Sequence, residues 1–169
     1  MTDLDLSLAG MIRWGTIPGG IWGTQITLET MASLARAGSR DVPPLVASLV
    51  PHGGDVSDFV LSIDRFLRRS FVYRAERDEV LRDVPFMLHD LSTLGHMEGD
   101  CDDMMIMGSA MLCSLLIPAR FTAIKSENVE EFDHVFTEAR IGTHWIPVDP
   151  TVPYGTRYTV YGYMSEVVC

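Results

Sequence analysis

Three residues of this chain have the types and the order of an activated-thiol site. Cys101 lies at a predicted helix start, His134 lies on a predicted strand, and Asp149 lies on the strand that follows. A cysteine nucleophile needs a base that makes and holds its thiolate, and the base needs a carboxylate that orients it. The intervening chain has room for one helix and one strand before His134, and for one hairpin before Asp149. These spacings predict a thiol-based catalytic site.

The predicted hairpin around Gly142 brings His134 and Asp149 within reach of each other. With a two-residue turn between 141 and 144, His134 lies opposite residue 151 and diagonal to Asp149; with a loop two residues longer, it lies directly opposite Asp149. Both registers are compatible with contact, because opposite Cβ atoms of an antiparallel pair are ~5 Å apart. His144 precedes Asp149 on the same strand at an odd spacing, so its side chain lies on the other face. His134 is therefore the better base.

The position of Cys101 in the first helical turn has opposing effects on the pKa of its thiol. Unpaired N–H groups, the helix dipole and a neighbouring histidinium all favour the thiolate. The carboxylates of Asp100, Asp102 and Asp103 oppose it, because nearby negative charge raises a thiol pKa. If these carboxylates cap amides or face solvent, the dipole and His134 prevail. If one lies against the sulfur, the thiol reacts slowly, and the sequence leaves both outcomes open.

Helices must position the cysteine. Apolar residues recur at helical spacing over 24–38 and 56–67, and Asp55 is a suitable N-cap for the second of these helices. A third helix is predicted over 101–116, with Asp100 as its N-cap. Its apolar residues cover most of its circumference, which is typical of the buried central helix of a domain.

Strands must position the histidine and the aspartate. Beyond Pro118 the apolar period changes to two, which predicts strands over 121–125, 133–140 and 144–148, and a fourth over 156–163. Helices followed by an antiparallel sheet indicate the α+β class. The expected fold has N-terminal helices and a buried, cysteine-bearing helix that packs on a C-terminal antiparallel sheet.

The rest of the chain is predicted to be less regular. Residues 1–23 are expected to form an irregular N-terminal arm, because glycines and a proline punctuate them, and 24–169 to form a single domain. Pro43-Pro44 is expected to break the chain before a short apolar segment over 45–50. Residues 71–73 are predicted to be extended, and 74–98 to be loop or broken helix.

Composition bounds the class of protein. With 169 residues, of which 47% are apolar, the chain is expected to fold as one domain. A net charge of −10 argues against nucleic acid or an anionic membrane surface as a partner. The chain has no apolar run of the ~18 residues that a membrane helix needs and no basic leader at its start. Three widely spaced cysteines predict free thiols in a cytoplasmic protein, with Cys113 in the core and Cys169 exposed.

Four sequence blocks resemble the transglutaminase-like superfamily, whose core is a papain-like fold with a cysteine, a histidine and an aspartate. The blocks are Gly-Asp-Cys-Asp-Asp at 99–103, Leu-Ile-Pro-Ala-Arg at 116–120, Asp-His-Val-Phe at 133–136 and Trp-Ile-Pro-Val-Asp-Pro-Thr at 145–151. The resemblance covers about residues 55–153, and it is to small bacterial and phage-associated proteins classed as cysteine proteases. It implies Cys101 as the nucleophile, His134 as the general base and acid, and Asp149 as the residue that orients the histidine.

Two positions depart from the family pattern. Leu116 replaces a usual glycine and Val135 a usual aromatic residue, and neither change removes one of the three site residues. The family also includes members that have lost activity and serve in binding. The alternative function is therefore a non-catalytic structural or assembly protein of a phage or phage-like particle.

Further residues complete the predicted site. An oxyanion hole needs a second donor beside the backbone N–H of Cys101, and Gln25 and Tyr73 are the candidates. The chemical alternative is a metal site built from the same three residues together with Asp102, although the paired spacings typical of zinc are missing. We otherwise expect no cofactor and no metal. Arg120 is interpreted as one half of a structural ion pair.

The expected function is a thiol-dependent amide hydrolase, a peptidase or amidase, or else an acyl transferase. Both reactions pass through a thioester, so the motif does not distinguish them. The expected substrate is a peptide or protein amide. We expect no nucleic-acid or membrane partner, a cytoplasmic or virion-associated location, and a homo-oligomer or phage-particle contact through residues 1–23.

Overall fold

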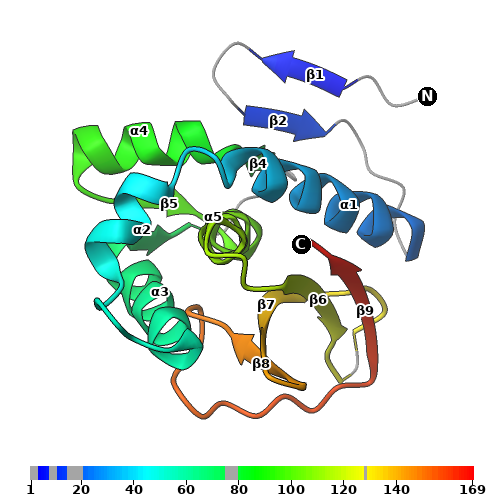
Figure 1. Ribbon diagram of the computed structural model, residues 1–169. Coiled ribbons are helices and arrows are strands. Elements are labelled where there is room, and N and C mark those ends of the chain that lie inside the picture. The colour runs from blue at the N-terminus through cyan, green and yellow to red at the C-terminus, as the bar shows by residue number, and fades with distance from the viewer. Residues whose placement is uncertain (1–3, 8–10, 15–20, 75–79, 128) are drawn as a thin grey trace.

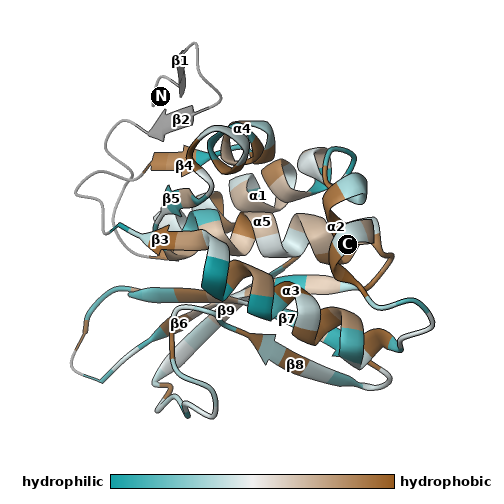
Figure 2. Ribbon diagram, turned by 90° about the vertical axis from the view of Figure 1, so that its left-hand side faces the viewer, coloured by the Kyte–Doolittle hydropathy of each residue, from teal (hydrophilic) through white to brown (hydrophobic). Residues whose placement is uncertain are grey.

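The computed structural model describes residues 4–7, 11–14, 21–74, 80–127 and 129–169. Its helices form one layer and its main sheet forms a second layer beneath them (Figure 2). One helix, α5, is seen end-on at the centre of Figure 1, with the other helices and the sheet around it. The α+β fold and its central cysteine-bearing helix are therefore confirmed.

The central helix α5 (Cys101–Ser114) begins where the sequence predicts. The Asp100 carboxylate accepts the backbone N–H of Asp102 at 3.1 Å and so caps the first turn. Every residue from 103 to 112 is buried, as expected for a helix that is apolar on nearly all sides. Leu116 follows the helix with φ +58°, and its side chain is 90% exposed. This left-handed conformation is one that glycine adopts more readily than leucine.

Four helices surround α5 in the part of the chain that the structure describes. Two of them have clear sequence reasons to begin where they do: a reciprocal capping box of Asp55 with Asp58 starts α3, and the carboxylate of Asp83 caps α4. The four are α1 (Ile21–Gly38), α2 (Pro43–Leu49), α3 (Val56–Ser70) and α4 (Val84–Leu94).

The main sheet is antiparallel, with the strand order β8-β7-β6-β9. Its strands are β6 (Ala119–Lys125), β7 (His134–Ile141), β8 (His144–Val148) and β9 (Gly162–Val167). Two smaller pairings use short strands. The strands β3 (Phe71–Tyr73) and β5 (Met97–Gly99) pair in parallel, and β1 (Leu4–Ser7), β2 (Met11–Trp14) and β4 (Val80–Arg82) form an antiparallel sheet.

Several predictions of irregular chain are wrong. Within the N-terminal arm predicted over 1–23, residues 4–7 and 11–14 are strands and α1 already begins at Ile21. Pro43 and Pro44 open α2 instead of breaking the chain, since a helix tolerates proline in its first turn. Residues 80–99 form β4, α4 and β5, and the fourth strand of the main sheet lies at Gly162–Val167, later than 156–163. Each of these elements is stabilised by strand pairing or packing with distant parts of the chain, which the local apolar periodicity does not indicate.

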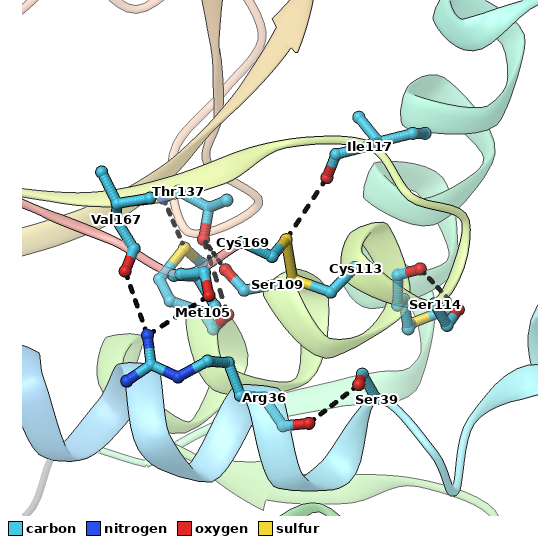
Figure 3. Close-up of a disulfide and its surroundings, with 12 residues drawn as sticks. Arg36, Ser39, Met105, Ser109, Cys113, Ser114, Ile117, Thr137, Val167 and Cys169 are labelled. Carbon is cyan, nitrogen blue, oxygen red and sulfur yellow. Dashed lines mark hydrogen bonds between the residues drawn. A yellow bond between two sulfur atoms is a disulfide. The ribbon is translucent and has the colours of Figure 1, made fainter.

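The prediction of three free thiols is also wrong. Cys113 near the end of α5 and Cys169 after β9 form a disulfide with their Cα atoms 6.0 Å apart (Figure 3), and only Cys101 is free. The two cysteines are 56 residues apart in the chain, so sequence spacing gives no sign of the pairing. The thiol-based reason for expecting a reducing compartment therefore does not hold. Among the helices of the described residues, none has the length and apolar character needed to span a bilayer.

Candidate active site

The β7–β8 hairpin brings His134 and Asp149 together. Ile141 pairs with His144, which is the register with the two-residue turn, so Asp149 is the diagonal neighbour of His134. The Nε2 atom of His134 lies 2.7 Å from Oδ2 of Asp149. The two side chains are 18% and 5% exposed, so the pair is largely shielded from water. The predicted proximity of the two residues is confirmed.

The Asp149 carboxylate is held on both of its oxygens. Its Oδ1 atom accepts the backbone N–H and the hydroxyl of Thr151, and its Oδ2 atom accepts His134 Nε2–H and the hydroxyl of Tyr158. Burial acts to raise the pKa of Asp149, but the hydrogen bonds from His134, Thr151 and Tyr158 hold that pKa below its ordinary value. The residue is therefore a fixed carboxylate across the neutral range, which suits it to orient an imidazole.

Cys101 lies against the beginning of β7. The backbone N–H of Val135, the residue directly after His134, donates to its sulfur. The thiol in turn donates to Oδ1 of Asp102 at 3.6 Å. Burial raises the pKa of Cys101, and the charges of Asp102 and Asp100 raise it further. Of the two outcomes that the sequence leaves open, the structure shows the one in which a carboxylate lies against the sulfur.

Asp103 faces the opposite way and has a structural role. Its side chain is fully buried, accepts the backbone N–H of Arg82 at 2.7 Å and pairs with the Arg82 guanidinium. The chain passes so close to this carboxylate at Gly99 that a Cβ atom there would lie 2.3 Å from Oδ2 of Asp103. The glycine two residues before Cys101 is therefore required for close packing.

The two oxyanion candidates lie in different places. Tyr73 lies beside the site, where burial raises its pKa and the neighbouring Cys101 raises it further. Gln25 lies on α1, and its amide donates to Glu29 at 2.7 Å and to Glu166 at 3.4 Å rather than to any of the three site residues. The structure therefore brings Tyr73, but not Gln25, to the site.

A cleft adjoins His134. It has a volume of about 310 Å³, and its walls are mostly apolar or hydroxyl-bearing. The described residues that line it are Tyr73, Ile124, Ser126, His134, Thr151, Val152 and Tyr158. The imidazole is therefore open to this cleft, whereas Cys101 is not among the described residues that line it.

Two residues of the site have no signal in the sequence. Tyr158 contacts both Asp149 and His134, although its position falls in a segment that was predicted only as a strand. Arg68, in the last turn of α3, donates to the backbone carbonyls of Asp149, Pro150 and Val152 at 2.7, 3.2 and 2.5 Å. The Arg68 contacts join residues more than 80 positions apart in the chain, so no local spacing in the sequence could indicate them. Arg120, as predicted, forms a structural ion pair, with Glu138 at 2.6 Å.

The metal alternative is not assembled as predicted. Among the residues that the structure describes, the group whose ligand atoms lie within 4.8 Å of one another is Asp100, Cys101 and Asp102. His134 and Asp149 are not part of this group, and Nε2 of His134 instead lies 2.7 Å from Oδ2 of Asp149. The histidine and the second-strand aspartate are thus arranged for hydrogen bonding to each other instead of for a shared ion.

Comparisons with known proteins show the family and the fold. The sequence profile of the transglutaminase-like superfamily matches residues 45–150. A crystal structure named "Putative Cysteine Protease from Cytophaga hutchinsonii" is similar to this chain with a TM-score of 0.53 and 24% identity over 67% of its residues. The match spans 37% of that protein's length, and at this identity it shows the fold alone. None of the curated proteins matches the chain.

Proposed function

Since the chain belongs to the transglutaminase-like superfamily, we propose that it is a cysteine-dependent amide hydrolase that acts through a thioester on Cys101. The observation that carries the proposal is the contact of 2.7 Å between His134 and Asp149, directly beside the residue whose N–H binds the Cys101 sulfur. In this proposal His134 is the general base and acid, and Asp149 orients it.

The orientation of the imidazole supports a defined path for the proton. Because Nε2 of His134 is bound to Asp149, Nδ1 is the ring nitrogen left to serve Cys101. The raised thiol pKa means that Cys101 rests as a protonated thiol at neutral pH. His134 therefore acts as a base during the attack, instead of holding a preformed thiolate.

The atoms balance over two half-reactions. In the first, the sulfur of Cys101 attacks the amide carbonyl carbon while its proton passes to Nδ1 of His134. The C–N bond then breaks, the imidazolium returns the proton to the departing amine, and a thioester remains. In the second, water gives a proton to His134 and attacks the thioester; the C–S bond breaks, a carboxylic acid is released, and His134 returns the proton to the sulfur. An amine in place of water would give acyl transfer, and the first half-reaction is common to both.

Alkylation of Cys101 by iodoacetamide tests the Cys–His pair without knowledge of the substrate. We expect His134→Ala to change the pH dependence of Cys101 alkylation, measured by mass spectrometry of the Cys101 peptide, whereas His144→Ala should not. His144 is the matched control, because it is exposed and lies at the other end of the same hairpin. Identical pH profiles in wild type and His134→Ala would overturn the proposal and favour the alternative, a binding or assembly protein with the same fold.

The contact between Asp102 and the sulfur gives a second expectation. Asp102→Asn removes one charge that raises the pKa of Cys101, so the thiolate fraction at neutral pH should increase. One pKa unit would make alkylation at pH 7.5 about tenfold faster. The exposed Asp41 is the control, and Asp41→Asn should leave the rate unchanged. A rate that does not rise in Asp102→Asn would mean that burial and Asp100, and not Asp102, set the reactivity of this thiol.

A further inference from the structure

The Tyr158 side chain lies against the His134–Asp149 pair and is held there independently of its hydroxyl group. Its ring stacks on Phe136 with the ring centres 5.4 Å apart and the planes 7° from parallel. The same ring lies 5.6 Å from the His134 imidazole, at a tilt of 38°. Loss of the hydroxyl alone would therefore leave the aromatic packing in place.

The Tyr158 hydroxyl has two partners, and their chemistry fixes the direction of each bond. The hydroxyl donates its proton to Oδ2 of Asp149, the oxygen that also accepts His134 Nε2–H. The hydroxyl oxygen lies 3.2 Å from Nε2 of His134. Because the proton of the hydroxyl is used on the carboxylate, the oxygen faces Nε2 as an acceptor. Burial and Asp149 both raise the pKa of Tyr158, so the group remains a donor throughout the neutral range.

We propose that Tyr158 is a positioning residue of the Cys101 site, which holds the His134 ring with Nε2–H toward Asp149 and Nδ1 toward Cys101. The hydroxyl also shares Oδ2 of Asp149 with the imidazole, and so limits how strongly this carboxylate stabilises the imidazolium. An imidazole whose charged form is stabilised further stays protonated up to a higher pH, so a smaller neutral fraction is free to take the thiol proton. The proposal rests on the function proposed above, in which His134 takes that proton.

A matched control lies four residues away in the same segment. The Tyr154 hydroxyl donates to Oδ2 of Asp64 at 2.6 Å, and Asp64 in turn binds Arg68 at 2.9 Å. Arg68 donates directly to the backbone carbonyls of Asp149 and Val152 and lies over the Tyr154 ring, 4.0 Å from its centre, and none of these contacts needs the Tyr154 hydroxyl. Tyr154→Phe therefore removes one tyrosine–carboxylate bond near the site without touching the His134–Asp149 pair.

The experiment compares Tyr158→Phe with Tyr154→Phe in the full chain by two measurements. The first is the downfield proton resonance of the His134 imidazole N–H, assigned by its absence in His134→Ala. The second is the pH profile of Cys101 acylation by p-nitrophenyl acetate, with the acylated peptide identified by mass spectrometry. We expect Tyr158→Phe to move the resonance downfield and to shift the acidic limb of the profile to higher pH by about half a unit to one unit. We also expect the plateau rate to fall about tenfold, because the ring is no longer held with Nδ1 toward Cys101. Tyr154→Phe should change neither the resonance nor the limb.

The outcomes separate this proposal from the one on which it rests. If the two variants behave alike in both measurements, Tyr158 is not a positioning residue, whatever the reactivity of Cys101. If wild-type Cys101 is not acylated at all, the proposed function fails, and the resonance alone still decides the placement of Tyr158. A resonance that moves in Tyr158→Phe together with an unchanged acidic limb would also overturn the proposal, because the hydroxyl would then have no effect on the base.

Discussion

Replacement of Cys101 by alanine is expected to abolish acylation of the protein by p-nitrophenyl acetate, with a loss of at least about 10⁴-fold in rate. The physical reason is that Cys101 is the free cysteine of the chain, since Cys113 and Cys169 are joined to each other. Once the sulfur is gone, no thiol can form the thioester, and a water held by His134 is a much weaker nucleophile. The measurement is the burst of p-nitrophenol together with the mass of the protein after the burst.

The same substitution should leave the fold intact, because the Cys101 side chain is only partly buried and its removal opens little space in the core. The urea midpoint of Cys101→Ala is therefore expected to lie close to that of wild type. Cys101→Ser is the matched variant, since it keeps a polar group of similar size at the start of α5. An acylated product at an unchanged rate in Cys101→Ala would show that another side chain reacts. Unfolding of Cys101→Ala would instead show that the residue is structural.

The second large effect is expected from the disulfide between Cys113 and Cys169. Removing it in the double variant Cys113→Ser/Cys169→Ser should lower the free energy of unfolding by about 4 kcal/mol, the chain-entropy value for a loop of this length. The bond joins α5, which carries Cys101 at its other end, to the chain just after β9. Near this bond, Arg36 of α1 donates to the carbonyls of Val167 and Val168, both at 3.3 Å (Figure 3). These contacts hold the end of the chain against the helical layer.

Urea unfolding with and without a reductant measures this effect, and the Cys101→Ala background removes interference from the third thiol. Reductant should lower the midpoint of Cys101→Ala and have no effect on the variant that also lacks Cys113 and Cys169. If reductant leaves the midpoint of Cys101→Ala unchanged, and the mass of the protein does not rise by two hydrogens per molecule, the two cysteines are not paired in solution. The prediction that Cys113 and Cys169 are free thiols would then be correct.

The binary pattern of the sequence and the turn residues were sufficient to predict that His134 and Asp149 lie within reach of each other, although two registers stayed open. Gly142 has φ +61°, a conformation that glycine adopts readily in a two-residue turn, and the register then follows from the alternation of the two strands. The central helix is likewise local in origin. Asp100 caps its first turn, and its apolar residues face all directions, so its burial follows from composition. Apolar periodicity and turn residues predict contacts of this kind, between residues that are close in the sequence.

The environment of the thiol was decided by tertiary structure. Asp100, Asp102 and Asp103 are equivalent as neighbours in the sequence, yet Asp103 points to Arg82, while Asp102 lies at 3.6 Å from the sulfur of Cys101. Which side of α5 meets which partner depends on how β4 and β7 pack against that helix. The pKa of the thiol therefore depends on packing that no motif encodes.

The supports of the site and the disulfide were also decided by tertiary structure. Tyr158 reaches Asp149 from a segment without regular structure, Arg68 reaches the same segment from α3, and Cys113 reaches Cys169 across 56 residues. These contacts form when distant parts of the chain close loops, and the free energy that selects them is that of the whole packed domain. The sequence by itself therefore determined the class of fold and the three residues of the candidate site, because apolar periodicity, helix caps, turn residues and short motifs indicate both. How strongly the site is held, and how reactive its thiol is, follow from the long-range packing.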